Sequence, residues 1–147
     1  MQFVINDGGR EAAGYKGKAG DCVTRAIAIA MGRPYQEIYD ILANGTANQR
    51  ASKHTSKRGK TARNGINTGR KWFKDWMASM GWTWTPTMGI GTGCQIHLKA
   101  EELPKGRLIV SVSKHLTAVI DGVIHDTFDP SRNGTRCVYG YYKKERA

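Results

Sequence analysis

The dipeptide Asp121-Gly122, set between two apolar runs, restricts the possible folds of this 147-residue chain more than any other feature. Residues 116–120 and 123–127 are rich in β-branched and aliphatic side chains, so the sequence predicts a β-hairpin with a two-residue turn. Such a turn fixes the register, because the residues next to it must pair with each other. Alternate residues of a strand point the same way, so the register also predicts which side chains share a face.

Two side chains with acid–base chemistry fall on one face of this hairpin. His115 lies on the face that also carries Asp126, and the register makes the two diagonal neighbours. His125 and Asp129 point to the opposite face, and Asp121 lies in the turn. A carboxylate beside a histidine can fix the tautomer of the ring and stabilise the imidazolium. The hairpin therefore predicts a His115–Asp126 pair.

The rest of the chain predicts helices first and strands after them. Apolar residues recur at helical spacing in three segments, and stop signals follow them at Gly32, at Asn44-Gly45 and at Gly81. This order is typical of an α+β domain with N-terminal helices packed on a C-terminal antiparallel β-sheet, and the length fits one domain, residues 1–147. The predicted helices cover 21–31, 35–42 and 68–80, and the predicted strands cover 2–5, 82–85, 107–113, 116–120, 123–127 and 136–142.

Cys22 stands at the predicted start of the first helix. The sequence predicts that the carboxylate of Asp21 caps this helix, which makes Cys22 its first residue. A helix N-terminus favours negative charge, and the thiolate is the reactive form of cysteine. One interpretation of Cys22 is a nucleophile, and the other is a small apolar core residue at the start of a buried helix.

The segments Gly20-Asp21-Cys22-Val23-Thr24-Arg25-Ala26 and 114–126 resemble the nucleophile and base regions of papain-like cysteine peptidases. In size and pattern the chain is similar to small bacterial and phage-encoded members, including bacteriocin-processing peptidase domains. The resemblance implies a papain-like fold and a thiol-dependent peptidase or related acyl-transfer hydrolase that acts on a peptide or protein substrate without a cofactor. Cys22 would be the nucleophile, His115 the base and Asp126 the residue that orients the base.

The resemblance also points to the oxyanion site. The amide of Cys22 would bind the oxyanion, together with a side chain from the loop before the helix. Papain-like peptidases usually carry a Gln six residues before the nucleophile, where this chain has Lys16. Lys16 or Lys18 is therefore the candidate donor, and the alternative is that both are exposed loop lysines. The His-to-Asp spacing of 11 is shorter than in papain itself.

A basic segment at about 46–69 offers a different class of function. It has no acidic residue and only one large aliphatic residue, Ile66, so the sequence predicts a mobile loop. The chain as a whole has a formal net charge of +11, which favours encounters with acidic partners or nucleic acid. The alternative function is thus a non-catalytic nucleic-acid-binding or inhibitor/adaptor protein that uses residues 46–71. The candidate contacts are Arg50, Lys53, Lys57, Arg58, Lys60 and Arg63.

The three cysteines, at positions 22, 94 and 137, have neither the spacing of a disulfide framework nor that of a metal site. A zinc site made by these cysteines with His97 or His125 is disfavoured, and Cys94 and Cys137 are interpreted as structural. The sequence predicts a cytoplasmic protein, in the host cytoplasm if it is phage-encoded, with no signal peptide and no membrane partner.

Overall fold

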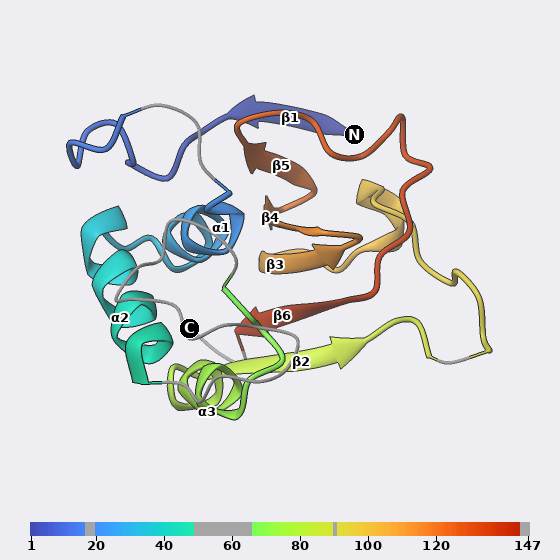
Figure 1. Cartoon of the computed structure of the whole chain (residues 1–147). Helices are drawn as coiled ribbons and strands as arrows, with labels where there is room; N and C mark the ends of the chain where they lie inside the picture. The colour runs from blue at the N-terminus through green and yellow to red at the C-terminus, as the bar shows by residue number, and fades with distance from the viewer. Residues whose placement is uncertain (17–19, 49–65, 90, 145–147) are drawn as a thin grey trace.

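The computed structural model describes residues 1–16, 20–48, 66–89 and 91–144. Over these residues the chain has the predicted α+β class, with three α-helices and one six-stranded sheet (Figure 1). The helices are α1 (Cys22–Met31), α2 (Tyr35–Asn48) and α3 (Lys71–Ser79), and a 3-10 turn, η1, covers Ala100–Glu102. The strands are β1 (Gln2–Ile5), β2 (Trp82–Pro86), β3 (Arg107–Val112), β4 (His115–Ile120), β5 (Val123–Asp126) and β6 (Gly140–Lys144).

The sheet is mixed, so the prediction of a wholly antiparallel sheet is wrong. Its strand order is β1-β5-β4-β3-β6-β2, and β1 runs parallel to β5 whereas the other neighbours are antiparallel. Strands joined by a tight turn must be antiparallel. β1 instead meets a strand from the other end of the chain, so no short connection dictates its direction.

The β4–β5 hairpin has the predicted turn and register. Asp121 and Gly122 both have positive φ, 49° and 81°, as the favoured two-residue hairpin turn requires. Ile120 pairs with Val123, Val119 with Ile124 and Ala118 with His125. The hairpin therefore carries His115 at the start of β4 and Asp126 at the end of β5.

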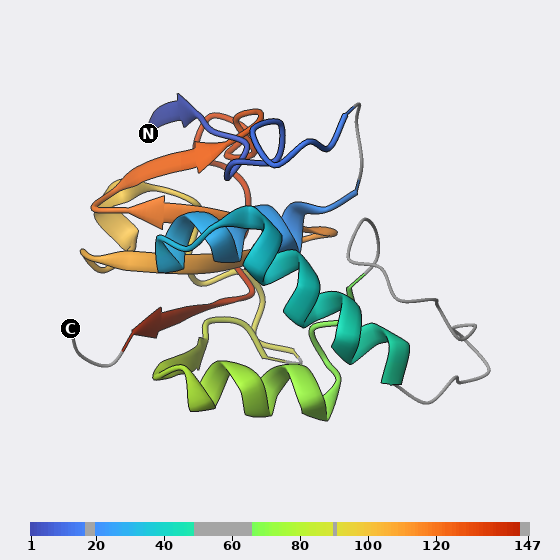
Figure 2. The same cartoon turned by 90° about the vertical axis from the view of Figure 1, so that its left-hand side faces the viewer.

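The helices cover one face of the sheet. α1 packs on β4 and β3, α2 packs beside α1, and α3 lies next to β2 (Figures 1 and 2). Every residue of α1 from position 23 to 30 is buried, and the helix ends at Gly32, whose φ is 67°. The core between helices and sheet includes Ile27, Ile38, Leu42, Phe73, Met77 and Ile109. A second cluster contains Leu98, Leu108, Val110, Val119, Ile124 and Val138.

Helix α2 continues to Asn48, so the prediction that Asn44-Gly45 ends it is wrong. Gly45 lies inside the helix with the ring of Trp72 packed against it, and a Cβ at this position would come within 2.3 Å of that ring. The glycine thus marks a close contact between α2 and the residues of α3. Of the predicted basic loop, residues 46–48 belong to α2 and 66–69 precede α3.

Strand β6 begins at Gly140, later than the predicted start at residue 136. Residues 136–138 instead form backbone hydrogen bonds with residues 96–98, where Cys137 and His97 form an isolated antiparallel β-bridge.

Cys137 also forms a disulfide with Cys94, so the expectation that the cysteines form no disulfide is wrong. The two cysteines are far apart in sequence, and only the fold brings their Cα atoms to 5.7 Å. Their structural role is confirmed.

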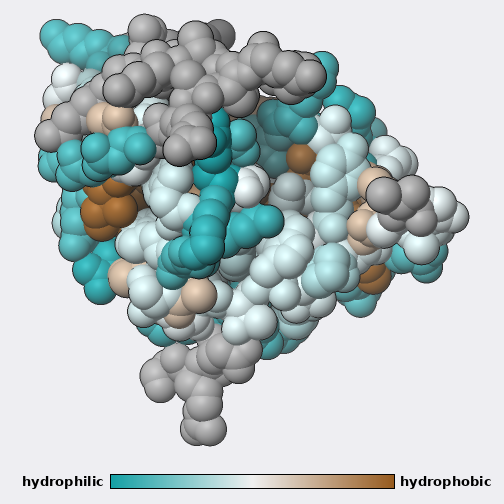
Figure 3. Space-filling view, turned by 60° about the horizontal axis from the view of Figure 1, so that its bottom comes forward, coloured by the Kyte–Doolittle hydropathy of each residue, from teal (hydrophilic) through white to brown (hydrophobic). Residues whose placement is uncertain are grey.

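Hydrophobic residues form separate spots on the visible face of the molecule in Figure 3, where hydrophilic residues dominate. None of the helices in the described part of the chain has the length and hydrophobicity that crossing a membrane requires.

Candidate active site

Cys22 is the first residue of α1, as predicted, and it is a half-buried free cysteine. Its backbone amide is among those that have no acceptor within the helix. The aligned peptide dipoles of α1 also favour negative charge at this end. The fold therefore presents a thiol where a thiolate and an oxyanion are both stabilised.

Asp21 does not cap α1 with its side chain, so this prediction is wrong. The Asp21 carboxylate is buried and turns toward other partners: Oδ2 accepts hydrogen bonds from Arg10 at 3.2 Å and from the Tyr35 hydroxyl at 2.6 Å. Oδ1 accepts from Arg25 on α1. Two guanidinium groups and a hydroxyl compensate a buried carboxylate better than the helix amides alone, which explains the difference.

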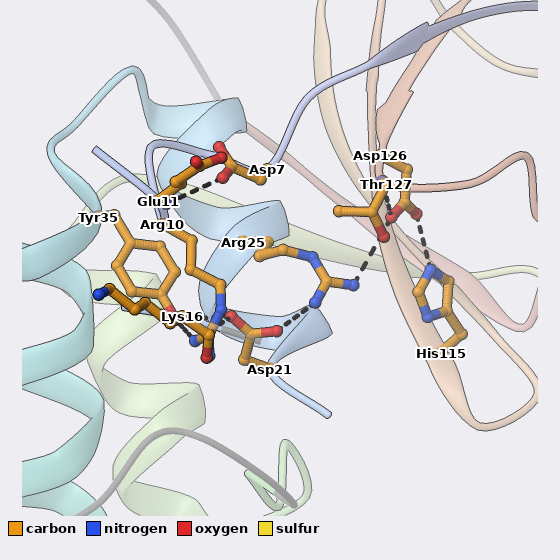
Figure 4. A network of polar contacts seen from close by, with 10 residues as sticks. All are labelled: Asp7, Arg10, Glu11, Lys16, Asp21, Arg25, Tyr35, His115, Asp126 and Thr127. Carbon is orange, nitrogen blue, oxygen red and sulfur yellow. Dashed lines mark hydrogen bonds and ion pairs between the residues drawn. The ribbon is translucent and has the colours of Figure 1, made fainter. Parts of the chain in front are cut away.

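His115 and Asp126 form the predicted pair. Nε2 of His115 lies 2.7 Å from Oδ2 of Asp126, and each of the two side chains is at most 9 % exposed (Figure 4). Thr117, on the same face of β4, donates its hydroxyl to Oδ2 at 2.6 Å. The amide of Thr127 donates to Oδ1 at 2.7 Å. Hydrogen bonds from Thr117 and Thr127 thus help to hold the carboxylate that orients the His115 ring.

The structure brings Cys22 to the His115 end of this pair. Because Nε2 of His115 is committed to Asp126, Nδ1 is the ring nitrogen available to the thiol. Burial raises the pKa of Cys22, but a hydrogen bond with His115, one from the backbone of Leu116 and the charge of Arg25 lower it below its ordinary value. The two segments that meet here come from opposite ends of the chain, on α1 and β4.

The pKa values of the pair favour a thiolate beside an imidazolium. Burial lowers the pKa of His115, but its hydrogen bonds with Asp126 and Cys22 raise it to about 9. Burial raises the pKa of Asp126, and hydrogen bonds from His115 and Thr117 hold it below its usual range. Each shift stabilises the charged form of its group, so the three charges support one another.

An aromatic side chain covers the base. The ring of Phe128, which follows β5, packs on the imidazole of His115 with 4.9 Å between ring centroids. Phe128 is itself 49 % exposed, so it lies between His115 and solvent. It restricts the rotation of the imidazole and limits the access of water to its face.

Cys22 and His115 line a cleft of about 440 Å³. A second hollow of about 560 Å³ has apolar, aromatic walls formed in part by Trp82, Trp84 and Tyr142. The two hollows share Thr68, Ser111, Leu116 and Tyr139 in their linings, so they are adjacent. The site therefore lies beside a hollow with an apolar, aromatic wall.

The other candidate residues have different placements. Lys16 is exposed and lies beside Arg10, whose Nη2 donates to the Lys16 carbonyl at 3.2 Å (Figure 4). Lys18 lies outside the described residues, so the assignment of an oxyanion donor to either lysine stays a prediction. Arg50, Lys53, Lys57, Arg58, Lys60 and Arg63 also lie outside the described residues.

Three groups that the sequence places outside the pair have other neighbours in the structure: Asp129, Asp121 and His125. Asp129 accepts from the amide of Ser131 at 2.9 Å, and Asp121 accepts from the amide of Gly106 at 2.8 Å. The charge of Arg107 lies close enough to His125 to lower its pKa further, in addition to burial. Within residues 1–16, 20–48, 66–89 and 91–144, no group of three or more His, Cys, Asp or Glu side chains is arranged to hold a metal ion.

Sequence reasoning missed three contacts of the site. The hydrogen bond from Thr117 to Asp126 was predictable, because the hairpin register places Thr117 on the same face as His115. Arg25 was one helical turn from Cys22, but nothing local indicated that it would meet Asp126. Lys114, which has a φ of 57° and lines the cleft, gave no signal beyond its position next to His115.

Comparison of the chain with protein-family models, with curated proteins and with solved structures finds no match.

Proposed function

We propose that this protein is a thiol-dependent peptidase or related acyl-transfer hydrolase that uses Cys22, His115 and Asp126. The observation that carries the proposal is the ordered chain of contacts from the thiol at the start of α1 to the imidazole and on to the carboxylate. A buried carboxylate, an imidazole with a raised pKa and a thiol with a lowered pKa are the requirements of nucleophilic catalysis by cysteine.

The proposed reaction begins with attack of the Cys22 thiolate on a carbonyl carbon, which forms a C–S bond and places negative charge on the carbonyl oxygen. The Cys22 amide donates to that oxygen. When the tetrahedral intermediate collapses, the leaving amine takes the proton of the His115 imidazolium. Water then attacks the thioester while His115 accepts its proton, and the C–S bond breaks to restore the thiolate.

The substrate we propose is a peptide or protein. The second hollow supports this choice, because it adjoins the cleft of Cys22 at Leu116 and Tyr139 and its aromatic wall offers contacts to substrate side chains away from the reacting atoms. The scissile group is a peptide bond, an isopeptide or a side-chain amide, since the same thiol chemistry serves all three. No step of this reaction uses a metal or a cofactor.

We also propose a papain-like fold. Its support is the combination of a nucleophile at the start of the first long helix with a base and an acid on strands of the sheet, in the order Cys22, His115, Asp126.

An incubation with a peptide library from digested cell extract tests the function, with the Cys22→Ala variant as the control. Mass spectrometry distinguishes hydrolysis, which creates new termini, from deamidation, which converts amide side chains to acids. Incorporation of an added primary amine reports acyl transfer. Products that appear equally with Cys22→Ala would contradict the proposal.

The alternative proposal, nucleic-acid or acidic-partner binding through residues 46–71, is supported by the net charge of +11. Titration with DNA or RNA at two salt concentrations tests it, because phosphate contacts give a steep dependence on salt. Tight, salt-sensitive binding without any thiol-dependent product would favour this alternative over the enzyme.

The cytoplasm, or the host cytoplasm for a phage-encoded chain, is the proposed location because Cys22 must stay reduced. The Cys94–Cys137 disulfide is an opposing observation, since such bonds persist mainly in oxidising compartments. Alkylation of thiols at the moment of cell lysis, followed by non-reducing peptide mapping, decides between the two compartments.

A further inference from the structure

A buried row of charges continues from the site into the loop before α1. Beyond His115 and Asp126 it passes through Arg25 and Asp21 to Arg10, so that positive and negative groups alternate (Figure 4). Tyr35 closes the row with hydrogen bonds to both Asp21 and Arg10. A buried charge is tolerated only when it is paired, and here each inner group has an opposite charge on both sides.

Arg25 occupies the centre of this row. Its side chain is 9 % exposed, and its two Nη atoms face different carboxylates: Nη1 bonds Asp21, and Nη2 lies 3.7 Å from Oδ1 of Asp126. Within the described residues, its Nε has no hydrogen-bond partner. The contacts of the guanidinium therefore converge on the two carboxylates, in the fork geometry that distinguishes arginine from lysine.

The position of Arg25 relates these contacts to the two halves of the site. It lies three residues after Cys22 on α1, whereas Asp126 lies on the hairpin that carries His115. The ion pair between Arg25 and Asp126 therefore connects the element that bears the nucleophile with the element that bears the base.

We propose that Arg25 is a positioning residue, which holds Asp126 where His115 meets it and is itself held by Asp21. The proposal rests on the proposed function, because it assigns a role within that site. The distances support this role: His115 has the short contact with Asp126, 2.7 Å, and Arg25 the long one, 3.7 Å. Asp21 keeps Arg25 at this distance, so the guanidinium steadies the carboxylate without displacing the imidazole. Arg25 acts together with the hydrogen bonds that Thr117 and the Thr127 amide donate to the same carboxylate.

The sign of a change in the pKa of His115 tests this role in the Arg25→Gln variant. Arg25 also lowers the pKa of Cys22, so the comparison is made in a Cys22→Ala background. There, removing a nearby positive charge would by Coulomb's law alone raise the pKa of His115 or leave it unchanged. Loss of positioning has the opposite effect, because an Asp126 that moves away no longer stabilises the imidazolium. We expect the pKa of His115, followed by NMR of its ring protons, to fall by about one pH unit, a tenfold change. A pKa that rises or stays constant in the folded variant overturns the proposal.

Arg33→Gln is the matched control, because Arg33 forms an exposed ion pair with Glu37. It should leave the pKa of His115 unchanged. Circular dichroism verifies folding, and if Arg25→Gln does not fold, the pKa of His115 is measured in Arg25→Lys instead. Lysine keeps the charge but cannot bridge two carboxylates, so the pKa of His115 should still fall, by less, and no fall overturns the proposal.

Failure of this inference is distinct from failure of the proposed function. Alkylation of Cys22 in the unchanged protein reports whether the thiol is activated. If it is, and Arg25→Gln leaves the pKa of His115 in place, only the role of Arg25 is wrong.

Discussion

Replacement of Asp126 by Asn removes the charge that faces His115 but keeps the size of the side chain. The pKa of His115 is raised from 6.5 to about 9 even though burial lowers it. At about 1.4 kcal/mol for each pH unit, this difference corresponds to about 3 kcal/mol of preference for the imidazolium. Asp126 is the stronger of the two partners that raise this pKa, and Cys22 is the other. We therefore expect Asp126→Asn to lower the pKa of His115 by more than about one pH unit.

NMR titration of the imidazole protons measures this pKa, with His115→Gln to assign the signal among the four histidines. The alkylation rate of Cys22 at neutral pH should fall in parallel, because the thiolate loses stabilisation when the imidazolium does. Asp129→Asn is the matched control, since Asp129 bonds the amide of Ser131 and should change neither quantity. A folded Asp126→Asn protein that keeps the pKa of His115 near 9 would refute the reasoning.

Three further predictions address pH, packing and chain accessibility. The rate of hydrolysis should rise with pH as Cys22 loses its proton, at a pH below the ordinary thiol pKa of 9.0. It should decline again above about pH 9, where His115 loses its proton. A rise without the later decline would contradict the role of the imidazolium as acid. Gly45→Ala should lower the melting temperature, because overpacking against Trp72 costs about 1–3 kcal/mol and exceeds the gain in helix propensity of about 1 kcal/mol. Gly89→Ala, where a Cβ would make only ordinary contacts, is its control, and equal melting temperatures for the two variants would show that the contact is unimportant. Limited trypsin digestion should cut first within 46–69, which has almost no apolar anchors, whereas early cuts in 22–42 or 107–127 would mean that the core is elsewhere.

The features predicted correctly from the sequence depend on local physics. A two-residue turn fixes the register of the hairpin, and with it the meeting of His115 and Asp126. Gly32 ends α1 because it adopts a positive φ that other residues avoid. The start of α1 at Cys22 follows from the change between a glycine-rich loop and an apolar periodic run.

The features that escaped prediction depend on contacts between distant segments. The parallel pairing of β1 and the Cys94–Cys137 disulfide join parts of the chain that no short connection links. Gly45 reads as a helix stop until Trp72 is known to pack on it. Asp21 has the sequence signature of a cap, but Arg10, Arg25 and Tyr35 reach its carboxylate only in the folded chain.

The pH dependence of Cys22 alkylation by iodoacetamide, in the native protein and in urea, tests the central claim most directly. We expect Cys22 of the folded protein to react at a lower pH than the same thiol in the unfolded chain, because His115 and the start of α1 stabilise its thiolate. We also expect it to react faster than Cys94 and Cys137 after their disulfide is reduced. His115→Ala should remove most of this advantage. Native Cys22 that reacts only at the pH of the unfolded thiol, or more slowly than Cys94 or Cys137 after reduction, would contradict the account.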